Sequence, residues 1–206
     1  MNAGNDGSNL IPPYGGYRNL RSFRCTQAVF DGTVNFCDRF IDKRSRTHDQ
    51  MVQAARSGVR NITEGSVASG TSKKIEIKLT GIAKASLEEL LGDYEDFLRQ
   101  RGLRIWNKDS PEALAVRRKY LPAPSDRSDR SDKSDQSDLS DAGIPLDPYG
   151  IASATPEAAA NTMICLIHQT TYLLRRQVNA QGQSFLKDGG FTERLYRERQ
   201  TRRRQT

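Results

Sequence analysis

Long apolar runs are absent from this chain of 206 residues. Its most apolar stretch, Met163 to Ile167, falls far short of the ~20 residues that a membrane-spanning helix needs. The start of the chain, Met1 to Asp6, lacks the basic segment and the apolar core of a secretory signal. We therefore expect a cytoplasmic protein without membrane association.

Cysteine is also scarce, with three residues in the chain. Cys25 and Cys37 lie on one expected helix, and their separation in sequence puts the two backbones ~18 Å apart, which excludes a disulfide between them. Free thiols suit a reducing compartment. Because Cys37 falls on an apolar stripe, we expect it to act as a small core side chain.

Motifs of catalysis are missing as well. The sequence contains no Gly-rich phosphate loop, no Gly-x-Ser-x-Gly, no Cys-x-x-Cys and no Glu-x-x-His pair of the kind that di-iron bundles use. Cys165 and His168 share a helix face, but two ligands make a weak zinc site. We expect no enzyme, no cofactor and no metal. A metal-dependent hydrolase, the least favoured function, would use carboxylates of Glu64, Glu88, Glu89, Asp93, Glu95 and Asp96.

What the chain has in excess is positive charge, which is unevenly placed. The net charge is +7. Nine basic and three acidic residues lie between Arg175 and Thr206, and seven basic and three acidic residues between Arg18 and Arg46. A Ser-Asp tract at 125–141 has three basic and six acidic residues. The two basic segments could therefore form a patch for an acidic partner.

Apolar residues spaced three and four apart predict four long helices. They cover about 17–42, 47–69, 71–101 and 155–188. The expected apolar stripe of the first helix is Leu20, Phe23, Gln27, Phe30, Val34, Cys37 and Ile41, widened by Thr33, Phe36 and Phe40. That of the second is Met51 or Val52, Ala55, Val59 and Ile62. That of the third is Ile75, Leu79, Ile82, Ser86, Leu87, Leu90, Tyr94 and Phe97, and that of the fourth is Ala160, Ile164, Ile167, Thr171, Leu174 and Val178.

Polar residues mark where these helices begin. Thr47 and Gln50 have the spacing of a capping box, Thr71-Ser72 can cap the third helix, and Thr155-Pro156 can start the fourth. Small residues in the second helix, Gly58 among them, predict a close approach of its neighbours. Gly189-Gly190 ends the fourth helix, and a last amphipathic helix is expected from Thr192-Glu193.

These elements predict an all-α fold, an antiparallel up-down four-helix bundle with a C-terminal helical suffix. We expect a flexible lead-in at 1–16, three bundle helices and a short helix at 17–121, a disordered low-complexity linker at 122–154, and the fourth helix with its basic suffix at 155–206. The Ser-Asp triplets have no apolar face and lack the shaped loops of calcium sites, so we expect them to be a solvated linker.

Five segments of the chain resemble a known family or its subgroup. Gln50 to Gly58, Asn61-Ile62-Thr63-Glu64-Gly65-Ser66 and Ser86-Leu87-Glu88-Glu89-Leu90 are similar to motifs of the four-helix-bundle family that includes the protein encoded in 23S rRNA intervening sequences and the accessory protein of diversity-generating retroelements. Thr63 replaces the usual alanine. The stretch from Asn161 to Gln169 and that from Gly189 to Tyr196 resemble the subgroup with a four-helix-bundle suffix. The resemblance implies a homopentameric ring and, for the retroelement relative, binding of RNA and a reverse transcriptase.

The leading hypothesis is a non-enzymatic oligomeric scaffold that binds nucleic acid, RNA more readily than DNA. The candidate contacts are Arg18, Arg21, Arg24, Lys43, Arg44, Arg46, Arg202, Arg203 and Arg204, with Tyr14, Tyr17, Tyr196 and Trp106 as aromatic groups for base stacking. The alternative is a protein-interaction module, in which the suffix helix or the Glu64-Gly65 end docks a partner enzyme such as a reverse transcriptase.

Overall fold

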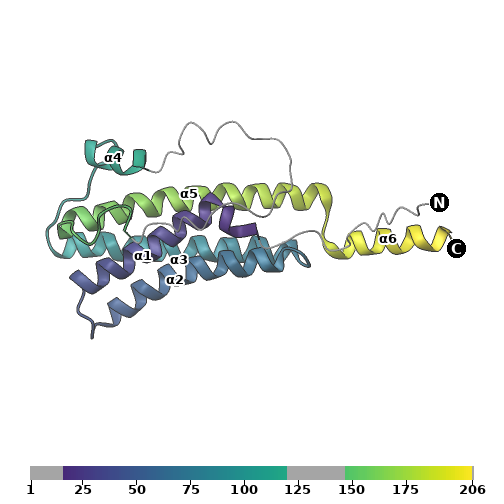
Figure 1. The fold of residues 1–206 in the computed structure, drawn as a ribbon, viewed down its shortest axis with the longest axis horizontal. Coiled ribbons are helices and arrows are strands. Elements are labelled where there is room, and N and C mark those ends of the chain that lie inside the picture. The colour runs from purple at the N-terminus through teal and green to yellow at the C-terminus, as the bar shows by residue number, and fades with distance from the viewer. Residues whose placement is uncertain (1–15, 120–146, 206) are drawn as a thin grey trace, which may run out of the picture.

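The computed structural model describes residues 16–119 and 147–205, and all regular secondary structure in these ranges is helical, without a strand (Figure 1). The expected all-α class is confirmed. The elements are the 3-10 turn η1 (Gly16–Asn19) and the helices α1 (Arg21–Phe40), α2 (Arg46–Ala68), α3 (Lys73–Gln100), α4 (Pro111–Lys119), α5 (Pro156–Asp188) and α6 (Phe191–Gln205). None of the described helices is both long and apolar enough to cross a membrane.

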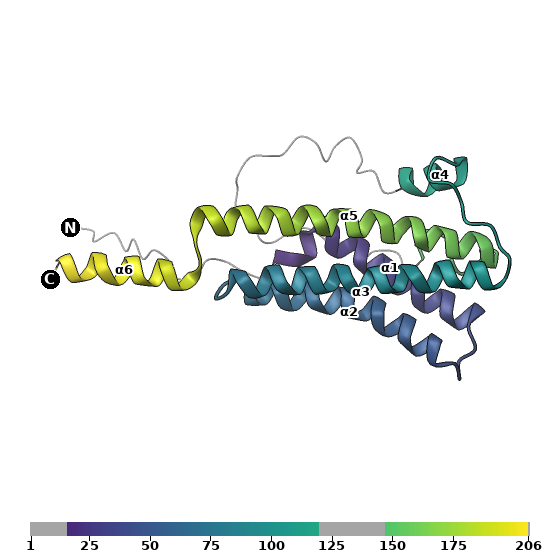
Figure 2. The ribbon, with the colours of Figure 1, turned by 180° about the vertical axis from the view of Figure 1, so that it is seen from behind.

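Four of these helices lie side by side (Figures 1 and 2). α1 packs against α2 and α5, and α3 packs against the same two helices. Neighbours run in opposite directions, as contacts at both ends of α1 show: Ser22 meets Gln177 late in α5, whereas Arg39 meets Ala154 just before α5. α4 lies over α5 near one end, and α6 extends beyond the other.

The buried face of α1 differs from the expected stripe. Leu20 is exposed, and Phe23, Phe30 and Val34 are only half-buried. The buried positions are Ser22, Cys25, Thr26, Ala28, Val29, Gly32, Thr33, Phe36 and Cys37. The prediction was therefore correct for Thr33, Phe36 and Cys37, but it left out the small and hydroxyl-bearing residues of the first half of the helix. Thr26 and Thr33 donate their hydroxyls to the carbonyls of Ser22 and Val29, so burial leaves neither hydroxyl without a partner.

Glycines let α2 approach its neighbours closely, as the small residues predicted. A Cβ at Gly58 would lie 3.1 Å from atoms of both Thr26 and Leu87. A Cβ at Gly65 would lie 3.3 Å from the backbone oxygen of Glu76 and from the Cβ of Leu79. The Gly65 contact is the stiffer of the two, because it meets backbone rather than the end of a side chain.

The central core draws on α1, α2, α3 and α5, and its aromatic cluster joins α1 to the second half of α3. The rings of Tyr94 and Phe97 each lie 4.8 Å from that of Phe36, in edge-on geometry. The buried Tyr94 hydroxyl donates to Thr33 Oγ1 at 3.0 Å. The expected apolar stripe of α3 is buried from Leu87 to the end of the helix. It is not buried in the first half, where Ile75 and Ile82 remain 47% and 39% exposed.

Helix starts were predicted with mixed success. Ser72 caps α3 and Thr155 caps α5, because their hydroxyls accept the backbone N–H of Ile75 and Ala158. The expected capping box at Thr47 is wrong, since α2 begins at Arg46 and Ser45 accepts from the N–H of Thr47. α6 begins at Phe191 and contains no buried residue among its described side chains.

The segment before α5, which falls within the linker expected at 122–154, packs against α1. Ile151 is only 1% exposed, and Arg39 of α1 donates to the carbonyls of Ile151 and Ala154. The carboxylate of Asp147 accepts the backbone N–H of Ile151 and Ala152. The apolar side chains of Tyr149 and Ile151 explain this packing. The Ser-Asp tract at 125–141 and the lead-in at 1–15 lie outside the described residues.

Replacing two helical glycines should change stability in opposite directions. Gly65→Ala should lower the free energy of unfolding by about 1–3 kcal/mol, because the added methyl overpacks against the backbone of α3. Gly81→Ala should raise it by about 0.5–1 kcal/mol, because a Cβ there meets no atom within 4 Å and alanine favours the helix. Urea unfolding of both variants checks this, and equal midpoints would contradict the close approach at Gly65.

Candidate nucleic-acid interface

The basic residues expected to bind nucleic acid do not form one patch. Arg18, Arg21 and Arg24 lie in or near the first turn of α1, whereas Lys43, Arg44 and Arg46 follow its last turn. A helix of 20 residues separates them by ~30 Å. Arg202, Arg203 and Arg204 lie at the end of α6, which extends away from the four packed helices (Figures 1 and 2). The structure therefore divides the nine residues among three places.

The turn between α1 and α2 carries nearly balanced charge. Lys43 Nζ lies 3.3 Å from a carboxylate oxygen of Asp38, and His48 Nε2 lies 3.6 Å from the same oxygen. The Asp42 carboxylate accepts the backbone N–H of Arg44 at 2.9 Å. These carboxylates offset the attraction that Lys43 and Arg44 would exert on a phosphate.

The outer seam of α2 and α3 is polar and acidic. An open groove of about 670 Å³ is lined by Arg46, Asp49, Gln50, Gln53, Ala54, Ser57, Ser86, Glu89 and Asp93. Burial raises the pKa of Asp93, and the nearby carboxylates of Asp96 and Glu89 raise it further. Three carboxylates against one guanidinium make this groove unfavourable for phosphates.

A second groove, of about 540 Å³, continues along α2 and shares Gln53 and Ser57 with the first. Glu64 lines it and is exposed, but Gly65 is buried against α3. Of the Glu64-Gly65 pair that the sequence offered for a partner, only Glu64 is therefore available for contact.

On the opposite side of the structure, the first half of α1 and nearly all of α5 lack acidic residues. There is no Asp or Glu between Arg18 and Phe30, and none between Glu157 and Asp188. The Ser22 hydroxyl donates to Gln177 Oε1 at 2.6 Å and thereby joins the two helices. Arg21 and Arg176 each precede one member of this pair and are exposed. Arg21 and Arg176 therefore flank the same contact between α1 and α5.

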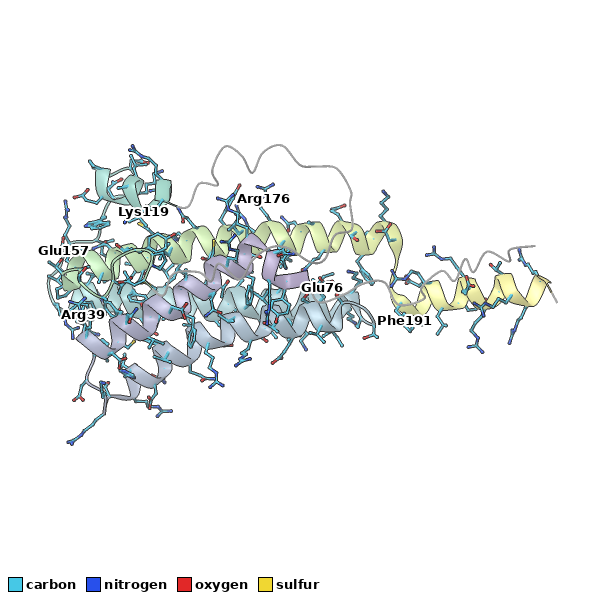
Figure 3. The ribbon with its side chains drawn as sticks, viewed as in Figure 1. Arg39, Glu76, Lys119, Glu157, Arg176 and Phe191 are labelled. Carbon is cyan, nitrogen blue, oxygen red and sulfur yellow. The ribbon has the colours of Figure 1, made fainter. Side chains whose placement is uncertain are left out.

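The end of α4 adds positive charge to this side. Burial raises the pKa of Cys165 on α5, while the charge of Arg117 acts in the opposite direction, which places Arg117 near that thiol. Figure 3 shows Lys119 and Arg176 on the same side of α5. We call the following residues the basic band: Arg21, Arg117, Arg118, Lys119, Arg175 and Arg176.

Few of the expected aromatic groups are available for stacking on a base. Tyr17 packs edge-on against Phe23 at 4.8 Å, and Trp106 packs against the core. Tyr196 on α6 is 63% exposed, and Tyr14 lies outside the described residues. Sequence reasoning missed Tyr172 of α5, which is 50% exposed and carries the Arg175 guanidinium 5.5 Å from its ring centroid.

The sequence did contain a signal for the missed residues. The basic C-terminal segment of the sequence analysis begins at Arg175. A longer stretch without acidic residues begins at Ala158 and includes both Arg175 and Arg176. The absence of negatively charged residues over this stretch identifies α5 as a basic helix. It does not indicate that α5 packs against α1, because that packing depends on a tertiary contact between distant residues.

The thiols and histidines do not gather into a metal centre. Cys165 is half-buried and His168 is exposed, and no group of three or more His, Cys, Asp or Glu side chains in residues 16–119 and 147–205 could hold a metal ion. Burial raises the pKa of the Cys37 thiol to about 12, with added effects from Asp38 and Asp93. Cys37 has the environment of a core residue, as its place on an apolar stripe predicted.

Comparisons with known proteins give this chain no relative: no protein-family model, no curated protein and no solved structure matches it.

The thiol of Cys37 should resist modification in the folded protein. It is fully buried, and a pKa of about 12 keeps it protonated at mildly alkaline pH. Labelling with a thiol reagent, followed by peptide mass spectrometry, should modify the partly exposed Cys165 first and Cys37 only after denaturant is added. Equal labelling rates at the two sites in native protein would contradict the packing of α1.

Proposed function

We propose that this protein is a non-enzymatic, oligomeric helical scaffold that binds nucleic acid, RNA more readily than DNA, through its basic surface. The basic band on α1, α4 and α5 supplies the main phosphate contacts. The arginines of α6, Arg202, Arg203 and Arg204 among them, assist as a separate arm. Lys43, Arg44 and Arg46 contribute less, because carboxylates surround them.

The observation that carries this proposal is the charge difference between the two sides of the structure. α5 contains no acidic residue between its first and last turns, while α2 and α3 line an acidic groove. Phosphates are attracted to the first side and repelled by the acidic groove on the second. Such an asymmetry gives a polyanion one preferred orientation on the protein.

The proposed architecture is the antiparallel up-down four-helix bundle, built from α1, α2, α3 and α5. The antiparallel contacts between neighbouring helices support it, as does the likeness of Gln50 to Gly58 and Asn61 to Ser66 to the family of the 23S rRNA intervening-sequence protein. That likeness also implies a homopentamer and a suffix, for which α6 is the candidate. Free thiols at Cys25, Cys37 and Cys165 fit the reducing cytoplasm.

Removing charge from the basic band should weaken RNA binding strongly. The variant Arg21→Ala/Arg175→Ala/Arg176→Ala should lose about tenfold or more in affinity, because charge-assisted contacts to phosphates are lost. The dependence of log K on log salt should flatten by about 0.7–0.9 for each arginine that contacts a phosphate. Fluorescence anisotropy with a labelled RNA, at low and physiological salt, measures both quantities.

The matched control is Lys43→Ala/Arg44→Ala/Arg46→Ala, which removes the same charge at the other end of α1. Its affinity should stay close to that of the unaltered protein. A larger loss in this control would move the interface to the turn between α1 and α2. No RNA binding by the unaltered protein, even at low salt, would reject the proposed function.

Self-association should depend on an exposed apolar surface of α3. Ile75 and Ile82 are two helical turns apart on one face and remain largely exposed, which supports a role in contacts between copies. The variant Ile75→Glu/Ile82→Glu should dissociate the oligomer, because contact between copies would bury unpaired carboxylates. Light scattering measures the mass, and a monomeric unaltered protein would contradict the proposed oligomer.

The alternative function is docking of a partner enzyme such as a reverse transcriptase. The observation that favours it is α6, a helix with no buried residue among its described side chains. A pull-down with the full chain, compared with a chain ending at Asp188, tests it. Loss of a partner enzyme in the shortened chain, with RNA affinity unchanged, would favour this alternative.

A further inference from the structure

Tyr172 lies in the middle of the basic band. Cys165, Gln169, Tyr172 and Arg176 are spaced so that they share one face of α5. Arg117 of α4 approaches the Cys165 end of this face. Arg176 lies at the other end, next to the Ser22–Gln177 contact that Arg21 also flanks, and the whole face is ~16 Å long. Positive charge therefore flanks Tyr172 on both sides along the helix.

The surroundings of Tyr172 differ from those of the core tyrosine of this protein. Tyr94 is fully buried and donates to Thr33, so its role in packing is evident. Tyr172 is 50% exposed, and Arg175 lies over its ring at 5.5 Å. This pair presents an aromatic surface and a cation together to the solvent, at a place with no acidic neighbour on its own helix.

We propose that the basic band recognises unpaired nucleotides of RNA and that Tyr172 stacks on one of their bases. This inference rests on the proposed function and adds the class of ligand. An unpaired strand exposes base faces that can stack on an aromatic ring, while its phosphates contact arginines on either side. In a duplex the bases are stacked on one another, so no base face is available to stack on Tyr172. The basic band would then bind the duplex only through electrostatic contacts with its phosphates.

The test compares two probes on three variants of the full chain. The probes are a fluorescein-labelled oligo(U) strand and an RNA duplex of the same length. The variants are Tyr172→Leu, which keeps an apolar side chain without the ring, Tyr172→Phe, which keeps the ring, and Leu186→Ala. Leu186 is 79% exposed on the same helix and serves as the matched control for loss of an exposed apolar group.

Tyr172→Leu should weaken oligo(U) binding by about tenfold and leave duplex binding unchanged, while Tyr172→Phe and Leu186→Ala keep the original affinity for both probes. Unchanged oligo(U) affinity of Tyr172→Leu would overturn the inference. Tighter binding of duplex than of oligo(U) by the unaltered protein would overturn it too. In both cases the RNA-binding function would stand, whereas failure of both probes to bind would reject the function itself.

Discussion

The contact between α1 and α5 determines which charged residues share a surface. Gly32 makes the contact tight at the centre, because a Cβ there would lie 2.7 Å from the Sδ of Met163. Ser22 and Gln177 join the helices nearer one end. The two helices are more than a hundred residues apart in sequence, so no local pattern places Arg21 beside Arg176. Without this contact Arg21 of α1 would not join the basic residues of α4 and α5 in the band.

Packing also explains why the charge is one-sided. The second half of α3 has several exposed acidic residues, and its Glu89 and Asp93 line an acidic groove together with Asp49 of α2. α5 has instead a stretch of neutral and basic residues between Glu157 and Asp188. A polyanion that approaches such a molecule is turned toward the positive side before any close contact forms. The long-range charge therefore orients the polyanion, and the arginines of the basic band then contact its phosphates.

The fold was more predictable than the site. Helix type follows from spacing and caps, which are local, and Ser72 and Thr155 act as their positions predicted. The buried side of α1 was predicted for Thr33, Phe36 and Cys37 but missed at Thr26, a threonine that bonds to its own helix and can therefore be buried at little cost. The packed segment around Ile151 was missed because it depends on Arg39 in a distant helix. The sequence predicted basic contacts on α1 but could not identify which helix would complete their surface.

The central claim, that the face of α5 around Tyr172 binds unpaired RNA, can be tested directly by photocrosslinking. The full chain bound to labelled oligo(U) would be irradiated, digested and analysed by mass spectrometry to locate the modified residue. The account predicts crosslinks at Tyr172 or next to it in α5, with few at the turn between α1 and α2. Crosslinks confined to Lys43–Arg46, or to α2 and α3, would contradict it.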